Sequence, residues 1–222
     1  MNYKDPWGLK EEWIKDLTDA AGGTVSWDDK TQTATVTIFG EKHEFKDGEN
    51  GVRIEAGRMY IDGDVFAKCF DKLDMSYVEY SGEGFSGFTL RLTYYRTRGM
   101  SASGVSVSAV VTKFDNTVEG ERLANQMNDV QGTLKDMMLS TIETGLSILS
   151  GGAAAVVLGW IWAATPYVYP FLEFSNRFVA GETVITQTKF VFSGTNRPSC
   201  TNLMMIKNIN GEVRKTVSST TN

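Results

Sequence analysis

The sequence is poor in the side chains that metal sites and acid–base catalysis use most. It has one histidine, His43, and two cysteines, Cys69 and Cys200. A single histidine excludes a multi-histidine zinc site and leaves only one base for a Ser-His-Asp triad. Two cysteines form at most one disulfide, which excludes a cysteine-framework fold. The P-loop, G-x-G-x-x-G and G-x-S-x-G motifs are missing too. We therefore expect no catalytic residue, no metal site and no cofactor, and predict that the protein is not an enzyme.

An excess of positive charge and an apolar N-terminal run are also lacking. The formal net charge is −5 and the pI is near 5.0, which excludes nucleic-acid binding through a broad basic surface. The first residues, MNYKDPWGLKEEWIKDL, are polar and charged and contain no apolar core of a signal peptide. An extracellular or envelope location therefore needs another export route, and a cytoplasmic location stays open.

Charge is missing from one long stretch, because no Asp, Glu, Lys or Arg occurs between Glu143 and Glu173. Such a stretch is long enough to span a bilayer, and its aromatic residues suit a membrane interface. It suits equally a buried pair of helices that turns at Ser150–Gly152, or a buried segment released on contact with lipid. These interpretations stay open. The candidate membrane-interacting residues are Val156, Val157, Leu158, Trp160, Ile161, Trp162, Tyr167 and Tyr169.

The first third of the chain shows short strand patterns after a helix. The helix is expected from Asp5-Pro6 to Gly22-Gly23, with Trp7 and Trp13 on or beside its apolar side. Thr33–Ile38 alternates threonine with apolar residues, which predicts a half-buried strand, and residues 41–46 form its return strand.

Two segments in this part, GGTVSWDDKTQTATVTIFG and ENGVRIEAGRMYIDGDVFAKCF, resemble the copper-amine-oxidase-N-terminal-like (stalk) domain of Gram-positive envelope proteins. The resemblance covers residues 9–73, and Asp62-Gly63-Asp64 departs from the family's usual Pro-x-Arg. It implies a small α+β adhesion or spacer module without catalysis or copper. Its matching residues are Val25, Trp27, Asp28, Lys30, Thr31, Thr33, Ala34 and Val36, then Gly57, Arg58, Met59, Tyr60, Ile61, Phe66 and Ala67.

The tryptophans of this module have two interpretations. Core packing is the commoner role of such side chains, and an exposed sugar-binding surface is the alternative. The candidate ligand contacts are Trp7, Trp13, Trp27 and Tyr60.

The rest of the chain alternates strand and helix patterns. Residues 88–96 and 104–114 predict an antiparallel hairpin, and an amphipathic helix is expected from about Thr117 to Leu149. Residues 183–192 predict a strand, and Asn210-Gly211 predicts a two-residue type I′ turn between the last two strands. We therefore predict an α+β fold, with a module over residues 1–75 and a β-β-α-α-β-β-β domain over residues 76–222 whose helices pack on an antiparallel sheet.

These patterns favour a non-enzymatic binding or assembly protein of a Gram-positive-type cell envelope or extracellular setting. The expected partner is a cell-wall polymer or a protein, and a homo-oligomer is possible. One alternative is a membrane-active protein, pore-forming or bacteriocin-like, that inserts residues 144–169 into lipid. A second alternative is a structural protein of a phage or mobile element.

Overall fold

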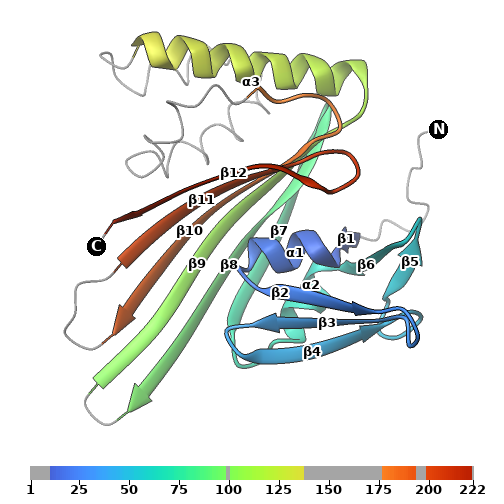
Figure 1. The fold of residues 1–222 in the computed structure, drawn as a ribbon, viewed down its shortest axis with the longest axis vertical. Coiled ribbons are helices and arrows are strands. Elements are labelled where there is room, and N and C mark those ends of the chain that lie inside the picture. Colours follow the sequence, from blue (N-terminus) through green and yellow to red (C-terminus); the bar gives the residue numbers. More distant parts are fainter. Residues whose placement is uncertain (1–10, 99–100, 138–176, 194–198, 222) are drawn as a thin grey trace.

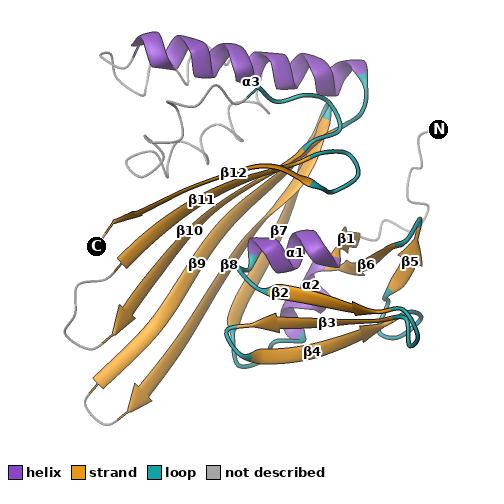
Figure 2. Ribbon diagram, in the orientation of Figure 1, coloured by secondary structure: helices purple, strands orange, loops and turns teal. Residues whose placement is uncertain are grey.

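The computed structural model describes residues 11–98, 101–137, 177–193 and 199–221. These ranges contain twelve strands and three helices, and the strands form three antiparallel sheets. Figure 1 shows one long, twisted sheet with a small module packed against one side and a helix across one end. This long sheet has six strands. Strands dominate the fold, as Figure 2 makes plain.

The small module contains two three-stranded sheets, ordered β1-β6-β5 and β2-β3-β4, and two short helices. Its first strand runs directly into its first helix, and its sixth strand runs directly into its second helix. The elements are β1 (Glu11–Trp13), α1 (Ile14–Ala20), β2 (Thr24–Asp28), β3 (Thr33–Ile38), β4 (Glu41–Lys46), β5 (Arg53–Glu55), β6 (Arg58–Asp62) and α2 (Gly63–Lys68).

The six-stranded sheet has the order β12-β11-β10-β9-β8-β7, so every neighbour in space is also the next strand along the chain. The hairpin predicted from residues 88–114 is confirmed, and its two strands are longer than the pattern suggested. The elements are β7 (Asp74–Gly82), β8 (Phe85–Arg98), β9 (Ser101–Phe114), α3 (Val118–Met137), β10 (Thr183–Ser193), β11 (Ser199–Lys207) and β12 (Val213–Thr221).

Alternation along the long strands produces one hydrophobic core on each face of this sheet. On β10, Ile185 belongs to the core shared with the module, whereas its neighbour Val184 belongs to the core under α3. The module supplies Ile14, Leu17, Val36, Ile38 and Phe66 to the first core, where they meet Phe88, Leu90, Leu92, Val107 and Val111 of the sheet. The second core joins Leu123, Ala124 and Met127 of α3 to Phe85, Phe114, Phe178, Met204 and Ile206.

The chain between β9 and β10 leaves the sheet and returns to it at paired positions. Phe114 donates a backbone hydrogen bond to Glu182 (2.9 Å) and accepts one from Gly181 (3.1 Å). Asn128 of α3 holds the returning chain, because its amide donates to the Phe178 carbonyl (2.8 Å) and its oxygen accepts from the Phe178 amide (2.7 Å). The helix predicted from about residue 117 is confirmed as far as Met137.

The predicted α+β class is wrong, since the described chain is mostly β and its three helices are minor elements. Part of the error lies in β7, for which the sequence analysis predicted no strand. Met75 and Tyr77 alternate inward along β7, but serine, glycine and glutamate between and after them obscure the period. The predicted helix over residues 5–22 is also too long, because Trp13 lies in β1 and the helix begins at Ile14.

The turn prediction at Asn210-Gly211 is wrong in type. Only Gly211 has a positive φ (80°), and the loop spans Asn208–Glu212 with Gly211 donating its amide to the Asn208 carbonyl (2.8 Å). Two-residue turns with both φ values positive occur instead at Phe39-Gly40 and Ala56-Gly57. The predicted division after residue 75 stays a prediction, and that position lies inside β7.

Candidate functional site

Trp27 is the most exposed of the candidate ligand contacts in the described part of the chain. It lies near the end of β2, an edge strand, and 44% of its surface is exposed. Its indole Nε1–H donates a hydrogen bond to Asp29 Oδ1 (2.6 Å), which fixes the orientation of the ring. An exposed tryptophan of fixed orientation loses little side-chain entropy on binding, so this ring is ready to contact a ligand.

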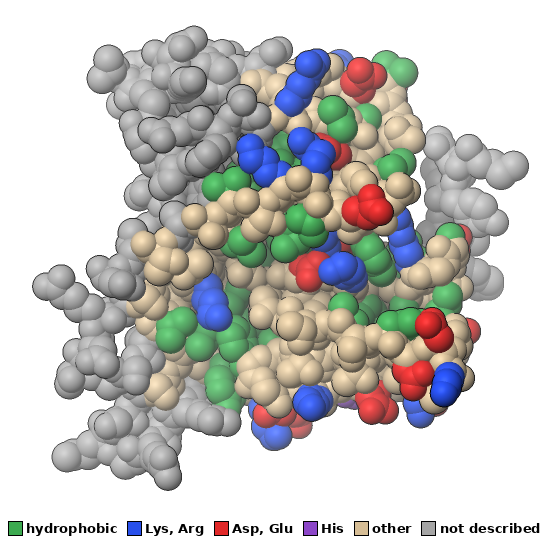
Figure 3. All heavy atoms as spheres, viewed as in Figure 1, with side chains coloured by type: hydrophobic (Ala, Val, Ile, Leu, Met, Phe, Trp, Pro, Cys, Tyr) green, Lys and Arg blue, Asp and Glu red, His purple; other side chains and the backbone are tan. Residues whose placement is uncertain are grey.

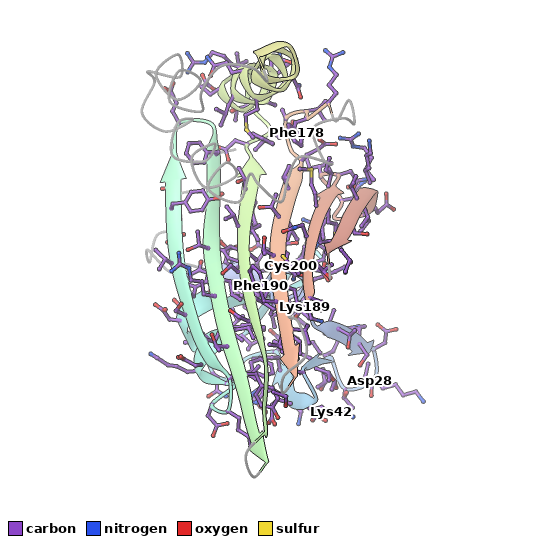
Figure 4. All side chains as sticks on the ribbon, turned by 90° about the vertical axis from the view of Figure 1, so that its left-hand side faces the viewer. Asp28, Lys42, Phe178, Lys189, Phe190 and Cys200 are labelled. Carbon is purple, nitrogen blue, oxygen red and sulfur yellow. The ribbon has the colours of Figure 1, made fainter. Side chains whose placement is uncertain are left out.

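The turn that follows Trp27 is held by its own polar side chains. Asp28 accepts a hydrogen bond from the Lys30 amide (2.9 Å), and Gln32 donates to the Asp29 carbonyl (2.8 Å). The backbone amide of Lys30 also lowers the pKa of the Asp28 carboxyl, so this group is ionised at neutral pH. Figure 4 shows Asp28 projecting from the module, away from the six-stranded sheet. We call residues 27–32 the Trp27 turn.

Trp13 and Tyr60 are brought together, but both rings are engaged within the fold. They are directly opposite each other in the β1–β6 pair. Arg58 lies 4.8 Å from the Trp13 ring centroid, and Arg53 lies 5.2 Å from that of Tyr60. The loop after β11 packs on Trp13, since a Cβ added at Gly211 would come within 2.3 Å of the indole. Trp13 is therefore mainly a packing residue.

The remaining candidate residues lie outside the described residues. These are Trp7 and the membrane-interacting set Val156, Val157, Leu158, Trp160, Ile161, Trp162, Tyr167 and Tyr169, together with the whole charge-free stretch. Among the residues that the structure does describe, no helix is both long enough and apolar enough to cross a membrane.

A buried charge cluster joins the module to the six-stranded sheet, and sequence analysis missed it. Lys207 of β11 is fully buried, and its Nζ lies 2.7 Å from Asp16 Oδ1 and 2.5 Å from Asp19 Oδ2 of α1. Lys113 of β9 forms an ion pair with Glu12 of β1 and lies 3.6 Å from Asp16. Opposite charges thus meet across the interface between the module and the sheet.

The electrostatics of this cluster follow from its burial. Burial raises the pKa of the Glu12 carboxyl, although the Lys113 ammonium opposes that shift. Burial disfavours the charged form of Lys113, but the carboxylates of Glu12 and Asp16 outweigh it and raise its pKa. Burial and the Glu12 charge also raise the pKa of Tyr77, whose hydroxyl donates to Glu12 (3.4 Å). Three acids, Glu12, Asp16 and Asp19, thus face two lysines, Lys113 and Lys207, and each lysine links the module to the sheet.

We expect Glu12→Gln to remove a pH dependence of stability. Because the pKa of Glu12 in the fold is raised above its ordinary value, the folded state binds a proton more readily than the unfolded state does. The contribution of Glu12 to the free energy of unfolding therefore increases as the pH falls through that raised pKa. Urea unfolding at about pH 8 and about pH 5 should show wild type gaining stability relative to Glu12→Gln on acidification. A constant difference between the two proteins would contradict the assigned shift.

The other residues with catalytic potential are placed as structural side chains. His43 on β4 lies against Phe45, with the ring centroids 4.7 Å apart. Cys69 is half-buried, Cys200 is buried, and burial raises the pKa of both thiols. Over residues 11–98, 101–137, 177–193 and 199–221 there is no group of three or more His, Cys, Asp or Glu side chains suited to a metal ion.

A signal for the buried charge cluster was present in the sequence. Glu12, Asp16 and Asp19 follow three- and four-residue spacing beside the apolar Ile14 and Leu17. Lys207 directly follows the apolar run Leu203–Ile206 at the end of β11. Charged side chains require an opposite charge where the fold buries them. Nothing in the pattern says which acid meets which lysine.

Comparison with known proteins finds no matching family model, no similar curated protein and no similar solved structure.

Proposed function

We propose that this protein is a non-enzymatic binding or assembly protein that contacts its partner through the Trp27 turn. The observation that carries the proposal is the exposed indole of Trp27, fixed by Asp29 at the end of an edge strand. Tryptophan is the side chain most often responsible for a large share of binding energy. The setting that we propose is a Gram-positive-type cell envelope or another extracellular surface, with wall polymer as the ligand.

The order of elements in the module supports this proposal. A short helix, a strand pair that carries Trp27, and a later strand running into a helix follow one another over residues 14–68. The stalk domain that this segment resembles is expected to have a helix followed by a strand pair, and the resemblance implies adhesion or spacing outside the cell.

The proposal is tested by sedimentation of the purified chain with Gram-positive cell-wall sacculi, with and without their attached anionic polymer. We expect Trp27→Ala to weaken binding about tenfold or more, because a central tryptophan commonly contributes at least about 2 kcal/mol. The matched control is Val78→Ala, which removes an exposed apolar side chain (62% exposed) from the six-stranded sheet. The melting temperature of both variants should stay close to that of wild type.

Two results would overturn the proposal. One is wild-type protein that does not sediment with either form of the sacculi. The other is Trp27→Ala protein that binds as tightly as wild type does while Val78→Ala behaves identically.

A further inference from the structure

The outer edge of β2 is an unpaired strand edge that is open to solvent. Strand β2 is the first strand of the β2-β3-β4 sheet and pairs with β3 alone. Four of its five residues are exposed, and Val25 is the half-buried exception. An edge of this kind presents free backbone N–H and C=O groups to any strand that approaches it.

The two edges of this small sheet are protected very differently. The opposite edge strand, β4, reads EKHEFK, and its four charged side chains discourage pairing with another strand. Strand β2 reads TVSWD and has no charge before its last residue and no proline. Figure 3 shows charged side chains gathered along the lower margin of the module, where Figure 1 places β4. Strand β4 therefore carries charges that discourage pairing with another strand, and strand β2 does not.

The sequence of β2 is complementary to itself in the antiparallel direction. If Ser26 lies on a two-fold axis, Ser26 is opposite its own copy and Val25 is opposite Trp27 of the other copy. Because the pairing is symmetric, this aromatic–aliphatic pair forms twice, and all four side chains lie on one face. At the ends, Thr24 is opposite Asp28, so no like charges meet.

We propose that two copies of this chain associate through β2, with Ser26 on the two-fold axis. The two three-stranded sheets then join into one sheet of order β4-β3-β2-β2-β3-β4, and the free backbone groups of both edges become paired. This inference deepens the proposed function, on which it rests for the role of Trp27, because the dimer brings two Trp27 rings to one face. A polymer could then contact both rings at once.

The dimer is expected to be weak, because the contact consists of one pair of five-residue strands. Such a contact is smaller than a standard stable interface. Sedimentation equilibrium should therefore be measured up to several hundred micromolar. We expect reversible monomer–dimer exchange, and Ser26→Lys should weaken the dimer about fivefold or more by placing two like charges opposite each other on the axis. Ser76→Lys, the same change at an exposed serine on β7, an edge strand of the six-stranded sheet, is the matched control.

The register is tested by disulfide formation between copies. Residues directly opposite in an antiparallel pair have Cα atoms about 4.5–5.5 Å apart, which a disulfide accepts. Ser26→Cys should therefore form a covalent dimer under mild oxidation. Thr24→Cys is equally exposed, but its two copies would lie about 13 Å apart and should not cross-link. Wild-type protein, which contains Cys69 and Cys200, sets the background.

The outcomes separate this inference from the proposed function. The dimer is overturned if the chain stays monomeric at every concentration, or if Thr24→Cys and Ser26→Cys proteins cross-link equally. In either case the wall-binding proposal is judged by the Trp27→Ala result alone. A dimer with the Ser26 register in a protein that does not bind sacculi supports the inference and overturns the wall-binding proposal. A dimer that Ser26→Lys leaves unchanged overturns the β2 assignment.

Discussion

Replacement of Lys207 by methionine is expected to destabilise the fold by about 3–5 kcal/mol, the largest effect that we predict. Lys207 is fully buried and is the nearest cation to both Asp16 and Asp19. In the variant, Asp16 keeps only Lys113 at 3.6 Å and Asp19 keeps only Lys15 at 3.2 Å. Breaking a buried ion pair costs far more than the pair contributes, because the remaining charge has lost its water as well as its partner. Urea unfolding of the purified chain measures the loss.

The control for this prediction is Lys189→Met on the neighbouring strand β10. Lys189 faces the same side of the sheet, but it is half-buried and its ammonium lies 5.2 Å from the Phe39 ring without an acidic partner in that contact. We expect a loss of about 1 kcal/mol or less there. The triple variant Lys207→Met, Asp16→Asn and Asp19→Asn should recover part of the loss. A Lys207→Met protein as stable as the Lys189→Met control would contradict the structural role of the cluster.

The second large effect is expected from Gly87→Ala, at about 3 kcal/mol. A Cβ at this position on β8 would lie 2.1 Å from the Val111 carbonyl oxygen and 2.8 Å from the Tyr80 hydroxyl. The ring of Tyr80 lies across Gly87, its directly opposite residue on β8, and its hydroxyl donates to the same Val111 carbonyl (2.7 Å). The added methyl group therefore pushes against backbone and breaks a hydrogen bond.

Thr89→Ala is the control for the glycine variant, because Thr89 is two residues further along the same strand and on the same face. It is half-buried, and its truncation should change stability by about 0.5 kcal/mol or less. Burial raises the pKa of Tyr80 to about 12, so the hydroxyl stays protonated and remains a donor at neutral pH. Comparison of thermal midpoints tests both variants, and equal midpoints would refute the predicted clash.

The strands with simple alternation were predictable from the sequence, and those with mixed signals were not. On β9, Val105, Val107 and Val111 alternate with serine and threonine, and the strand was found. On β7, glycine and serine at the end of the strand resemble a linker, so its pairing with β8 was missed. The turn at Phe39-Gly40 has positive φ at a phenylalanine (48°), where sequence preference favours asparagine or glycine.

The placement of the module on the sheet was beyond prediction for a different reason. It depends on contacts between residues far apart in the chain, such as Asp16 with Lys207, and no local pattern determines which distant partners meet. The candidate site likewise depends on contacts between residues far apart in the chain. Trp27 is exposed, whereas Trp13 packs against the loop after β11, and this difference depends on contacts between distant segments that a one-dimensional pattern does not contain.

The chain that leaves β9 and the chain that enters β10 are held side by side by the pairing of these two strands. Lys113 and Thr183 are opposite each other, so the strand order and register on either side are the same whatever length of chain connects them. Lengthening a connection whose ends are already together costs little extra entropy. The strand register at this point is therefore independent of the length of the connection, whereas the second core still requires Leu123, Met127 and Phe178 from it.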